Sequence, residues 1–296
     1  MPRLVDLFCG CGGMSLGFQE AGFDVIEAFD NWQPALDTYA SNFNHPVTAM
    51  DLSDDESVSD YIANLHPDII IGGPPCQDFS IAGKREFRGK RANLTLAYAR
   101  TIQTVRPRWF VMENVYNIQK SPIFQEAIEI FKNAGYGLTI RILDASLMGA
   151  PQARKRCFVI GKQGAEDNFI SDAINSNLAK KPMTLRAYLG DSLGTEYYYM
   201  HPRSYNRRAI FSIDEPSSTI RGVNRPMPAT YNFHPADKCT DISKIRPLTS
   251  AERSYIQTFP KGYVFKGSSA QIEQQIGNAV PVKMAKFVGE LIISNF

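Results

Sequence analysis

Asp68-Ile69-Ile70-Ile71-Gly72-Gly73-Pro74-Pro75-Cys76-Gln77-Asp78-Phe79-Ser80 is the stretch around which this chain is organised. A short β-branched run that stops at two glycines predicts a buried parallel strand ending in a loop, where α/β enzymes carry their reactive groups. Pro74 and Pro75 restrict the backbone just before Cys76, so its thiol is predicted to lie on a stiff segment. That position suits a nucleophile; a small cysteine packed under a turn is the alternative.

Length and composition indicate an ordinary folded protein. The chain has 296 residues, of which 44% are hydrophobic and 21% charged, enough for one large domain and a smaller one. No apolar run approaches the roughly 20 residues of a membrane helix, and no signal peptide precedes the first predicted strand, so we expect a cytoplasmic protein. The cysteines are odd in number and lack the spacing of a zinc site, so we expect free thiols and no metal. They are Cys9, Cys11, Cys76, Cys157 and Cys239.

Charge is distributed unevenly along the chain. Residues 1–77 carry twelve acids and one base, a charge of −11, so the net charge of +2 leaves +13 for residues 78–296. The excess begins directly after Cys76, at Lys84, Arg85, Arg88, Lys90 and Arg91. Such a surplus can simply keep a domain soluble, but its concentration in one loop favours an anionic polymer as partner.

The N-terminal region reads as a nucleotide-binding opening. A strand over residues 3–8 is followed by Cys9-Gly10-Cys11-Gly12-Gly13 and a helical pattern, which lets a ligand approach the backbone closely. Ser15 replaces the third glycine of the dinucleotide fingerprint, so a bound pyrophosphate is not indicated, and tight turns use glycine as well. A second strand, 24–29, ends at Asp30, where an acid can accept both hydroxyls of a ribose. A third, 46–50, ends at Asp51, which we keep as a second candidate ligand.

Another acid is predicted beside Cys76. A helix with Leu94 on its apolar face ends before Pro107, and the strand over residues 109–112 leads into Glu113-Asn114-Val115. If the strands of Cys76 and Glu113 are neighbours in a doubly wound sheet, nucleophile and carboxylate share one cleft. A surface glutamate that caps a helix is the alternative.

A basic segment and an irregular region follow. Alternation over Gln152-Ala153-Arg154-Lys155-Arg156 sends one amide and two guanidiniums to one face, which suits an anion or a carboxylate, although a solvated charge run would look alike. Periodicity fades over residues 164–243, which predicts a separate, mostly β module. Its tyrosines 197–199 read as core or strand residues, whereas Arg221 and Arg225 lie among glycine and proline on loops fit for a groove.

Taken together and in this order, these motifs resemble the DNA cytosine-5 methyltransferases, of the bacterial restriction-modification type. The resemblance implies an α/β fold: a Rossmann-like S-adenosylmethionine-dependent methyltransferase domain with a smaller, mostly β or irregular target-recognition domain. It places the catalytic domain at residues 1–163 plus 272–296, target recognition at 164–245 and a connecting segment at 246–271. The closing motif, Gly277-Asn278-Ala279-Val280, implies that the C-terminal helix folds back onto the first domain.

The resemblance also implies roles for individual residues. Cys76 is the nucleophile, assisted by Glu113, Arg154 and Arg156. Phe8 packs on the adenine, Asp30 binds the ribose and Asp51 lies near the adenine amine. The full cofactor set is Phe8, Gly10, Gly12, Gly13, Asp30, Asn31, Asp51, Leu52, Pro75, Leu94, Asn278, Ala279 and Val280. The DNA-binding set is Gln77, Ser80, Lys84, Arg85, Arg88, Gln152, Thr219, Arg221 and Arg225.

The implied reaction is methylation of cytosine C5 in a short specific sequence of double-stranded DNA, with S-adenosyl-L-methionine as cofactor. The thiol would add at C6 of a flipped-out base, and the product would protect host DNA from a restriction enzyme; we expect a nucleoid-associated monomer. A tRNA cytosine-5 methyltransferase is the nearest alternative, but its Cys-Phe-Thr element is missing. Adenine and cytosine-N4 methyltransferases need no cysteine, and a catalytically dead DNA-binding protein would have lost Cys76 or Glu113. Ala82 departs from the larger residue often found there, which leaves open what fills the gap of the flipped base.

Overall fold

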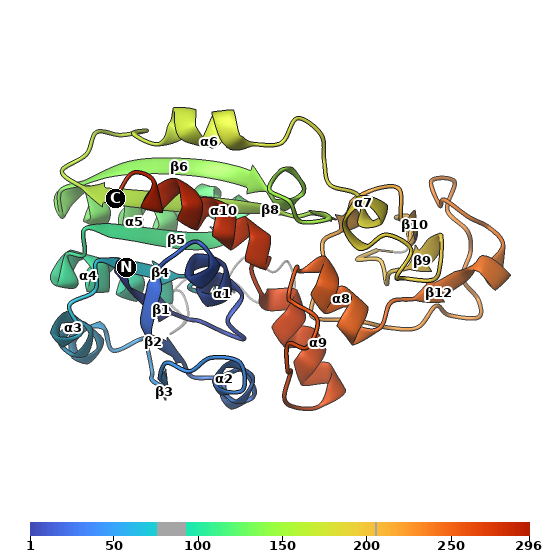
Figure 1. Ribbon diagram of the computed structural model, residues 1–296, viewed down its shortest axis with the longest axis horizontal. Coiled ribbons are helices and arrows are strands. Elements are labelled where there is room, and N and C mark those ends of the chain that lie inside the picture. The colour runs from blue at the N-terminus through green and yellow to red at the C-terminus, as the bar shows by residue number, and fades with distance from the viewer. Residues whose placement is uncertain (76–92, 205) are drawn as a thin grey trace.

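The computed structural model describes residues 1–75, 93–204 and 206–296 (Figure 1). Six predicted site residues lie outside the described residues: Cys76, Gln77, Ser80, Lys84, Arg85 and Arg88. The described part of the chain forms a large α/β layer structure and a smaller module beside it, which Figure 1 shows at opposite ends of the molecule.

Seven strands of the described chain form one sheet in the order β3-β2-β1-β4-β5-β8-β6. Neighbours are parallel except at β8, which runs antiparallel to both β5 and β6. The strands are β1 (Arg3–Leu7), β2 (Asp24–Asp30), β3 (Val47–Ala49), β4 (Ile69–Gly72), β5 (Trp109–Val115), β6 (Tyr136–Asp144) and β8 (Lys155–Gln163). Since β4 and β5 pair directly, the expected adjacency of the strands that precede Cys76 and contain Glu113 is confirmed.

Helices cover both faces of this sheet because its strands are apolar on both sides. Leu4, Ile69 and Trp109 pack toward one core and Val5, Ile70 and Phe110 toward the other, as alternation along buried strands requires. The first core lies under α1 (Gly13–Glu20) and α10 (Val282–Ile293). The second lies under α3 (Asp55–Asn64), α4 (Asn93–Val105) and α5 (Pro122–Asn133), and α2 (Gln33–Ala40) packs near β2 and β3.

The C-terminal helix returns to the start of the chain. Gly17 of α1 meets α10 so closely that an added Cβ would lie 2.5 Å from the Cβ of Ala285 and 2.5 Å from the carbonyl oxygen of Val282. Only a residue without a side chain permits this approach. The predicted fold-back of the last helix is thus confirmed.

The smaller module is built around short strands and long irregular segments. Its core joins Leu185, Tyr198, Phe211 and Ile220 to the helices that follow. Its elements are α7 (Leu185–Leu189), β9 (Tyr197–Tyr199), β10 (Ile210–Ser212), β11 (Ser217–Ser218), β12 (Ile245–Pro247), α8 (Ser250–Ile256) and α9 (Ser269–Asn278). Of the short 3₁₀ turns, η1 (Tyr116–Lys120) and η2 (Ala145–Leu147) follow β5 and β6 of the large sheet, and η3 (Ile242–Lys244) precedes β12. The tyrosines are strand residues, as predicted.

A strand pair joins this module to the segment before the large sheet's β8. Strand β11 pairs in parallel with β7 (Gln152–Ala153), which directly precedes β8. The helix α6 (Ser171–Asn177) belongs to the large part, since Ile170 and Ile174 pack in the same core as Trp109, although they follow the boundary expected at residue 164.

The described cysteines Cys9, Cys11, Cys157 and Cys239 are free thiols, as expected. None of the helices in residues 1–75, 93–204 and 206–296 is long and apolar enough to cross a membrane. The same residues contain no group of three or more His, Cys, Asp or Glu side chains that could hold a metal ion.

Candidate active site

A cavity of about 570 Å³ lies where β1, β2, β4 and β5 reach their carboxyl ends. Its walls come from the segments that follow these strands and β3, from the start of α4, from Arg154 and Arg156, and from the end of α9. The predicted site residues that line it are Phe8, Gly10, Gly13, Asp30, Asn31, Leu52, Pro75, Leu94, Glu113, Arg154, Arg156, Asn278, Ala279 and Val280. The parallel sheet therefore brings these predicted site residues together at the carboxyl ends of its strands, as expected.

The glycine loop shapes one end of the cavity. Phe8, Gly10 and Gly12 all have left-handed backbone, with φ of 61°, 53° and 89°. An added Cβ at Gly10 would meet nothing within 4 Å, so the loop leaves open space there. At Gly12 an added Cβ would overlap the ring of Phe43, and Gly12 lies behind the lining rather than in it.

Asp30 is oriented by the backbone around it. Its Oδ2 accepts a hydrogen bond from Gly10 N at 2.9 Å, and its Oδ1 accepts from Asn31 N at 2.8 Å and Trp32 N at 2.9 Å. The carboxylate thus ties the glycine loop to the end of β2. Asp51 differs: Met50 and Leu52 line the cavity on either side of it, while its own side chain is exposed and accepts from Ser53.

Glu113 lies at the end of β5 beside the loop after β4. Its Oε1 is 2.9 Å from Arg156 Nε, and the two side chains are only 11% and 14% exposed. Asn114 Nδ2 donates to Pro74 O at 2.9 Å, which holds the two strand ends together. Burial raises the pKa of Glu113, while the charges of Arg156 and Arg154 oppose that rise. The alternative of a surface acid that caps a helix is therefore wrong.

Gln152, Arg154 and Arg156 lie in three different environments. Arg154 is 1% exposed, and it donates through Nη1 to Ile220 O at 2.9 Å and through Nη2 to Gly277 O at 3.1 Å. Burial lowers the pKa of Arg154, and the positive charge of Arg156 adds to that effect. Arg154 reaches the cavity and also ties the β7–β8 segment to the backbone of Ile220 and of α9. The alternative of a solvated charge run is wrong.

Gln152 does not have the environment expected of a DNA-binding residue. Its side chain is completely buried; Nε2 donates to Gln257 Oε1 at 2.7 Å and Oε1 accepts from Ile220 N at 2.9 Å. An amide with no exposed surface and with protein partners on both ends cannot contact DNA in this conformation. It joins β7 to the small module instead.

The other predicted DNA-binding residues that the structure describes lie in the small module. Thr219 Oγ1 donates to Ala153 O at 3.1 Å, so it belongs to the junction with β7. Arg221 donates through Nη2 to His201 O and is partly buried, whereas Arg225 is exposed.

Several cavity residues were not named as site residues from the sequence. Trp32 follows Asp30 by two positions at the same strand end, and that position was the available signal. Gln274 and Gln275 carried no signal for this role, because only the tertiary fold brings that part of α9 to the strand ends. Met14 and Met50 were also missed. The remaining lining residues stood within quoted motifs without a role of their own: Cys9, Cys11, Gly73, Pro74, Asn114, Val115 and Gly277.

Comparison with known proteins agrees with this geometry. A family model described as C-5 cytosine-specific DNA methylase matches residues 2–294. The chain is 55% identical over 293 residues to Type II methyltransferase M.HindV of Haemophilus influenzae, which covers 99% of this chain and 96% of the relative. It is 52% identical over 286 residues to Type II methyltransferase M.HgiDI of Herpetosiphon aurantiacus, with 97% and 92% covered.

Solved structures show the same fold at much lower identity. The Dnmt2 methyltransferase of S. pombe is 17% identical and superposes with a TM-score of 0.72 over 99% of this chain and 98% of its own. A DNMT2 variant of Spodoptera frugiperda reaches 0.73 at 18% identity, with 99% and 100% covered. With the full-length family match and two relatives above 50% identity, the chain belongs to the C-5 cytosine-specific DNA methylases and is a DNA cytosine-5 methyltransferase, as its motif order predicted.

Proposed function

We propose that this enzyme methylates C5 of a cytosine within a short specific sequence of double-stranded DNA, with S-adenosylmethionine as methyl donor. The observation that carries the proposal is that buried Glu113 lines the same cavity as the glycine loop and Asp30. Glu113, an acid suited to bind a pyrimidine ring, therefore lies in the same cavity as the glycine loop and Asp30, which suit a nucleoside. Protection of host DNA from a cognate restriction enzyme is the proposed cellular role.

The residues present fit the cofactor. Gly10 leaves open space, and Asp30 Oδ2, which accepts one bond from the protein, keeps acceptor capacity for a ribose hydroxyl. Phe8, Leu52 and Leu94 supply apolar walls for an adenine, and Asn278 to Val280 close the cavity from α9. Asp51 and Gly12 lie next to this lining rather than in it. When bound, S-adenosylmethionine supplies an electrophilic methyl group.

The protein's contribution to the chemistry is activation of the base. C5 of cytosine is a poor nucleophile, so the Cys76 thiolate adds to C6 and raises the electron density at C5. Glu113, whose pKa is raised by burial, donates a proton to N3 as negative charge develops there. After methylation a base removes the C5 proton, the bond between the Cys76 sulfur and C6 breaks, and the N3 proton returns to Glu113.

Access to the base requires DNA distortion. C5 and C6 are stacked inside a duplex, and swinging the base out costs a few kcal/mol. The basic loop 78–91 supports this step on sequence grounds, with Lys84, Arg85 and Arg88 on the flanking phosphates and Gln77 and Ser80 near the base. Sequence choice is assigned to residues 164–245, with Arg221 and Arg225 as candidate base readers and Thr219 at the junction. The catalytic part is residues 1–163 plus 272–296, joined through 246–271.

The covalent step can be tested directly. A duplex with 5-fluorocytosine at the target cannot lose a proton from C5, so the protein should be trapped as a stable adduct when the cofactor is present. The target itself comes first, from bisulfite sequencing of DNA methylated by the purified protein. An adduct formed by Cys76→Ser would overturn the assignment of the nucleophile.

A further inference from the structure

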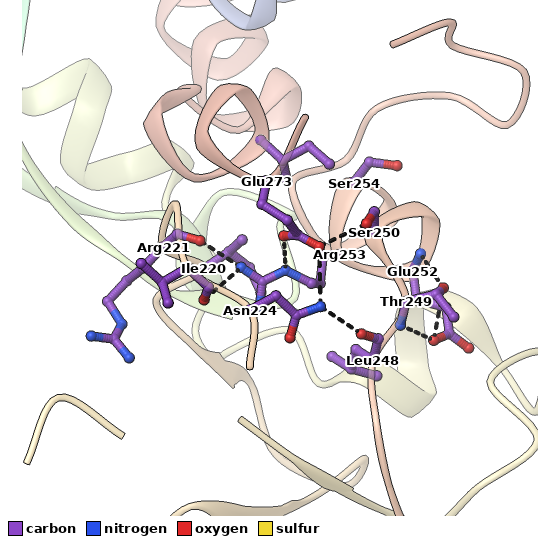
Figure 2. A network of polar contacts seen from close by, with 12 residues as sticks. Ile220, Arg221, Asn224, Leu248, Thr249, Ser250, Glu252, Arg253, Ser254 and Glu273 are labelled. Atoms are coloured by element: carbon purple, nitrogen blue, oxygen red, sulfur yellow. Dashed lines mark hydrogen bonds and ion pairs between the residues drawn. The ribbon is translucent and has the colours of Figure 1, made fainter. Parts of the chain in front are cut away.

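A buried pair of opposite charges lies in the small module, away from the cavity lining (Figure 2). Arg253 of α8 and Glu273 of α9 have side chains only 2% and 7% exposed, and Arg253 Nε lies 2.6 Å from Glu273 Oε2. Withdrawing two charges from water is costly, and apolar replacements of such pairs are often at least as stable. Stability alone therefore gives no reason for this pair.

Both partners hold one irregular loop. Arg253 donates through Nη2 to Arg221 O and, at 3.4 Å, to Val223 O. Glu273 Oε1 accepts from Asn224 Nδ2 at 3.0 Å, and Asn224 also donates to Leu248 O. Residues 219–228 form neither helix nor strand, so their backbone groups depend on side chains for partners.

The same loop also packs closely against the backbone of α9. An added Cβ at Gly277 would overlap Gly222 N, and one at Gly222 would lie 3.1 Å from Gln274 Cα. The backbone of the loop is thus fixed against α9, while Val223 is 44% exposed and Arg225 is exposed. Figure 2 shows the side chain of Arg221 extending away from the Arg253–Glu273 pair.

We propose that Arg253 and Glu273 are positioning residues for sequence recognition: they set the backbone of residues 220–224 so that Arg221, Val223 and Arg225 meet the base edges of duplex DNA in one register. This rests on the proposed assignment of sequence reading to residues 164–245. Hydrogen bonds to base edges need a set geometry, whereas attraction to phosphates tolerates displacement. Loss of the pair should therefore relax the choice of sequence more than it weakens binding to DNA.

Two variants and one matched control test this. Glu273→Gln keeps the shape but removes the charge, whereas Asn224→Ala removes the bonds of the loop to Glu273 and Leu248 and leaves the ion pair in place. Glu252→Gln is the control, because Glu252 lies on the same helix as Arg253 but pairs with Arg246 of β12, which reaches Leu193 O rather than the loop. Each protein methylates one plasmid of known sequence with S-adenosylmethionine, and bisulfite sequencing gives the rate at every cytosine. Melting temperature and calorimetry with S-adenosylhomocysteine accompany each sample.

We expect the wild type to methylate one sequence, and Glu273→Gln and Asn224→Ala also to methylate sites that differ from it at one position. Their preference should fall about tenfold, the discrimination of one base contact, with affinity for S-adenosylhomocysteine within about twofold. Glu252→Gln should keep the preference at a similar melting temperature. Unchanged preference in Asn224→Ala, or equal relaxation in the control, overturns this inference alone. A wild type with no fixed sequence overturns the proposed function and this inference with it.

Discussion

Arg156 reaches Glu113 diagonally across two antiparallel strands. Its register partner on β5 is Val115, two residues further along, and Arg156 Nε lies 2.9 Å from Glu113 Oε1. Residues two apart on neighbouring strands share a face, so this diagonal is open to a long side chain. The pKa of Glu113 is raised although Arg156 is in contact with it, so burial changes this pKa more than the attraction between the two charges does. The acid therefore keeps its proton to a higher pH than a free glutamate.

The first prediction concerns pH. In the wild type, kcat/KM for methyl transfer should fall as pH rises through the raised pKa of Glu113. Arg156→Met removes a charge that lowers this pKa, so the decline should move to higher pH. Glu113→Gln serves as control: it should lose about 100-fold or more in rate and lack this decline. A decline that stays in place or moves to lower pH in Arg156→Met would contradict the proposed role of Glu113.

The second prediction concerns the cofactor. Asp30→Asn should weaken binding of S-adenosylhomocysteine about tenfold or more, because a hydrogen bond to a charged group contributes about 1.5–3 kcal/mol. Asp51→Asn should have a smaller effect, since Asp51 is exposed beside the cavity lining. Isothermal titration calorimetry of both variants decides the matter. Equal affinity in Asp30→Asn and the wild type would remove Asp30 from the cofactor site.

The third prediction concerns Asp6, a buried acid in β1 whose Oδ2 accepts from Ser15 Oγ at 2.5 Å. Burial raises its pKa from 3.8 to about 7, so folding takes up a proton between these values. Stability contributed by Asp6 is then full below about pH 4 and is lost as pH rises to about 7. The free energy of unfolding of Asp6→Asn, measured relative to the wild type, should be higher at pH 8 than at pH 5 by roughly 2 kcal/mol.

Urea denaturation at both pH values measures this gain. Asp60→Asn, an exposed acid on α3, is the control and should show no comparable change. A constant difference between Asp6→Asn and the wild type at pH 5 and pH 8 would show that Asp6 does not titrate with folding.

The fourth prediction separates base contacts from phosphate contacts. Arg225→Ala should relax methylation at one position of the target, with about 1–3 kcal/mol of discrimination lost. Arg85→Ala should weaken binding to all sequences alike and reduce the salt dependence of affinity. Methylation rates on matched duplexes at several salt concentrations distinguish the two. A uniform loss in Arg225→Ala would make that residue a phosphate contact.

Strand ends were predictable because each buried strand is a short apolar run that stops at a polar or glycine residue. Asp30 and Glu113 were found in this way, and parallel pairing brought them to one edge. Alternation over Gln152, Arg154 and Arg156 predicted one shared face; Arg154 and Arg156 line the cavity, whereas Gln152 pairs with the small module. The partner of Gln152 was not predictable, since Gln257 is 105 residues away and nothing local specifies it.

The sequence by itself determined the α/β class, the family, the glycine loop and the acids at the strand ends, because periodicity and turn residues act over a few positions. Only the tertiary structure decided which side chains are buried and with whom. It placed α9 against both the cavity and the loop at residues 220–224, and it gave Arg154 two carbonyl partners 66 and 123 residues away. Burial and long-range hydrogen bonds depend on how distant segments pack, and it is this packing that raises the pKa of Glu113 and withdraws Gln152 from solvent.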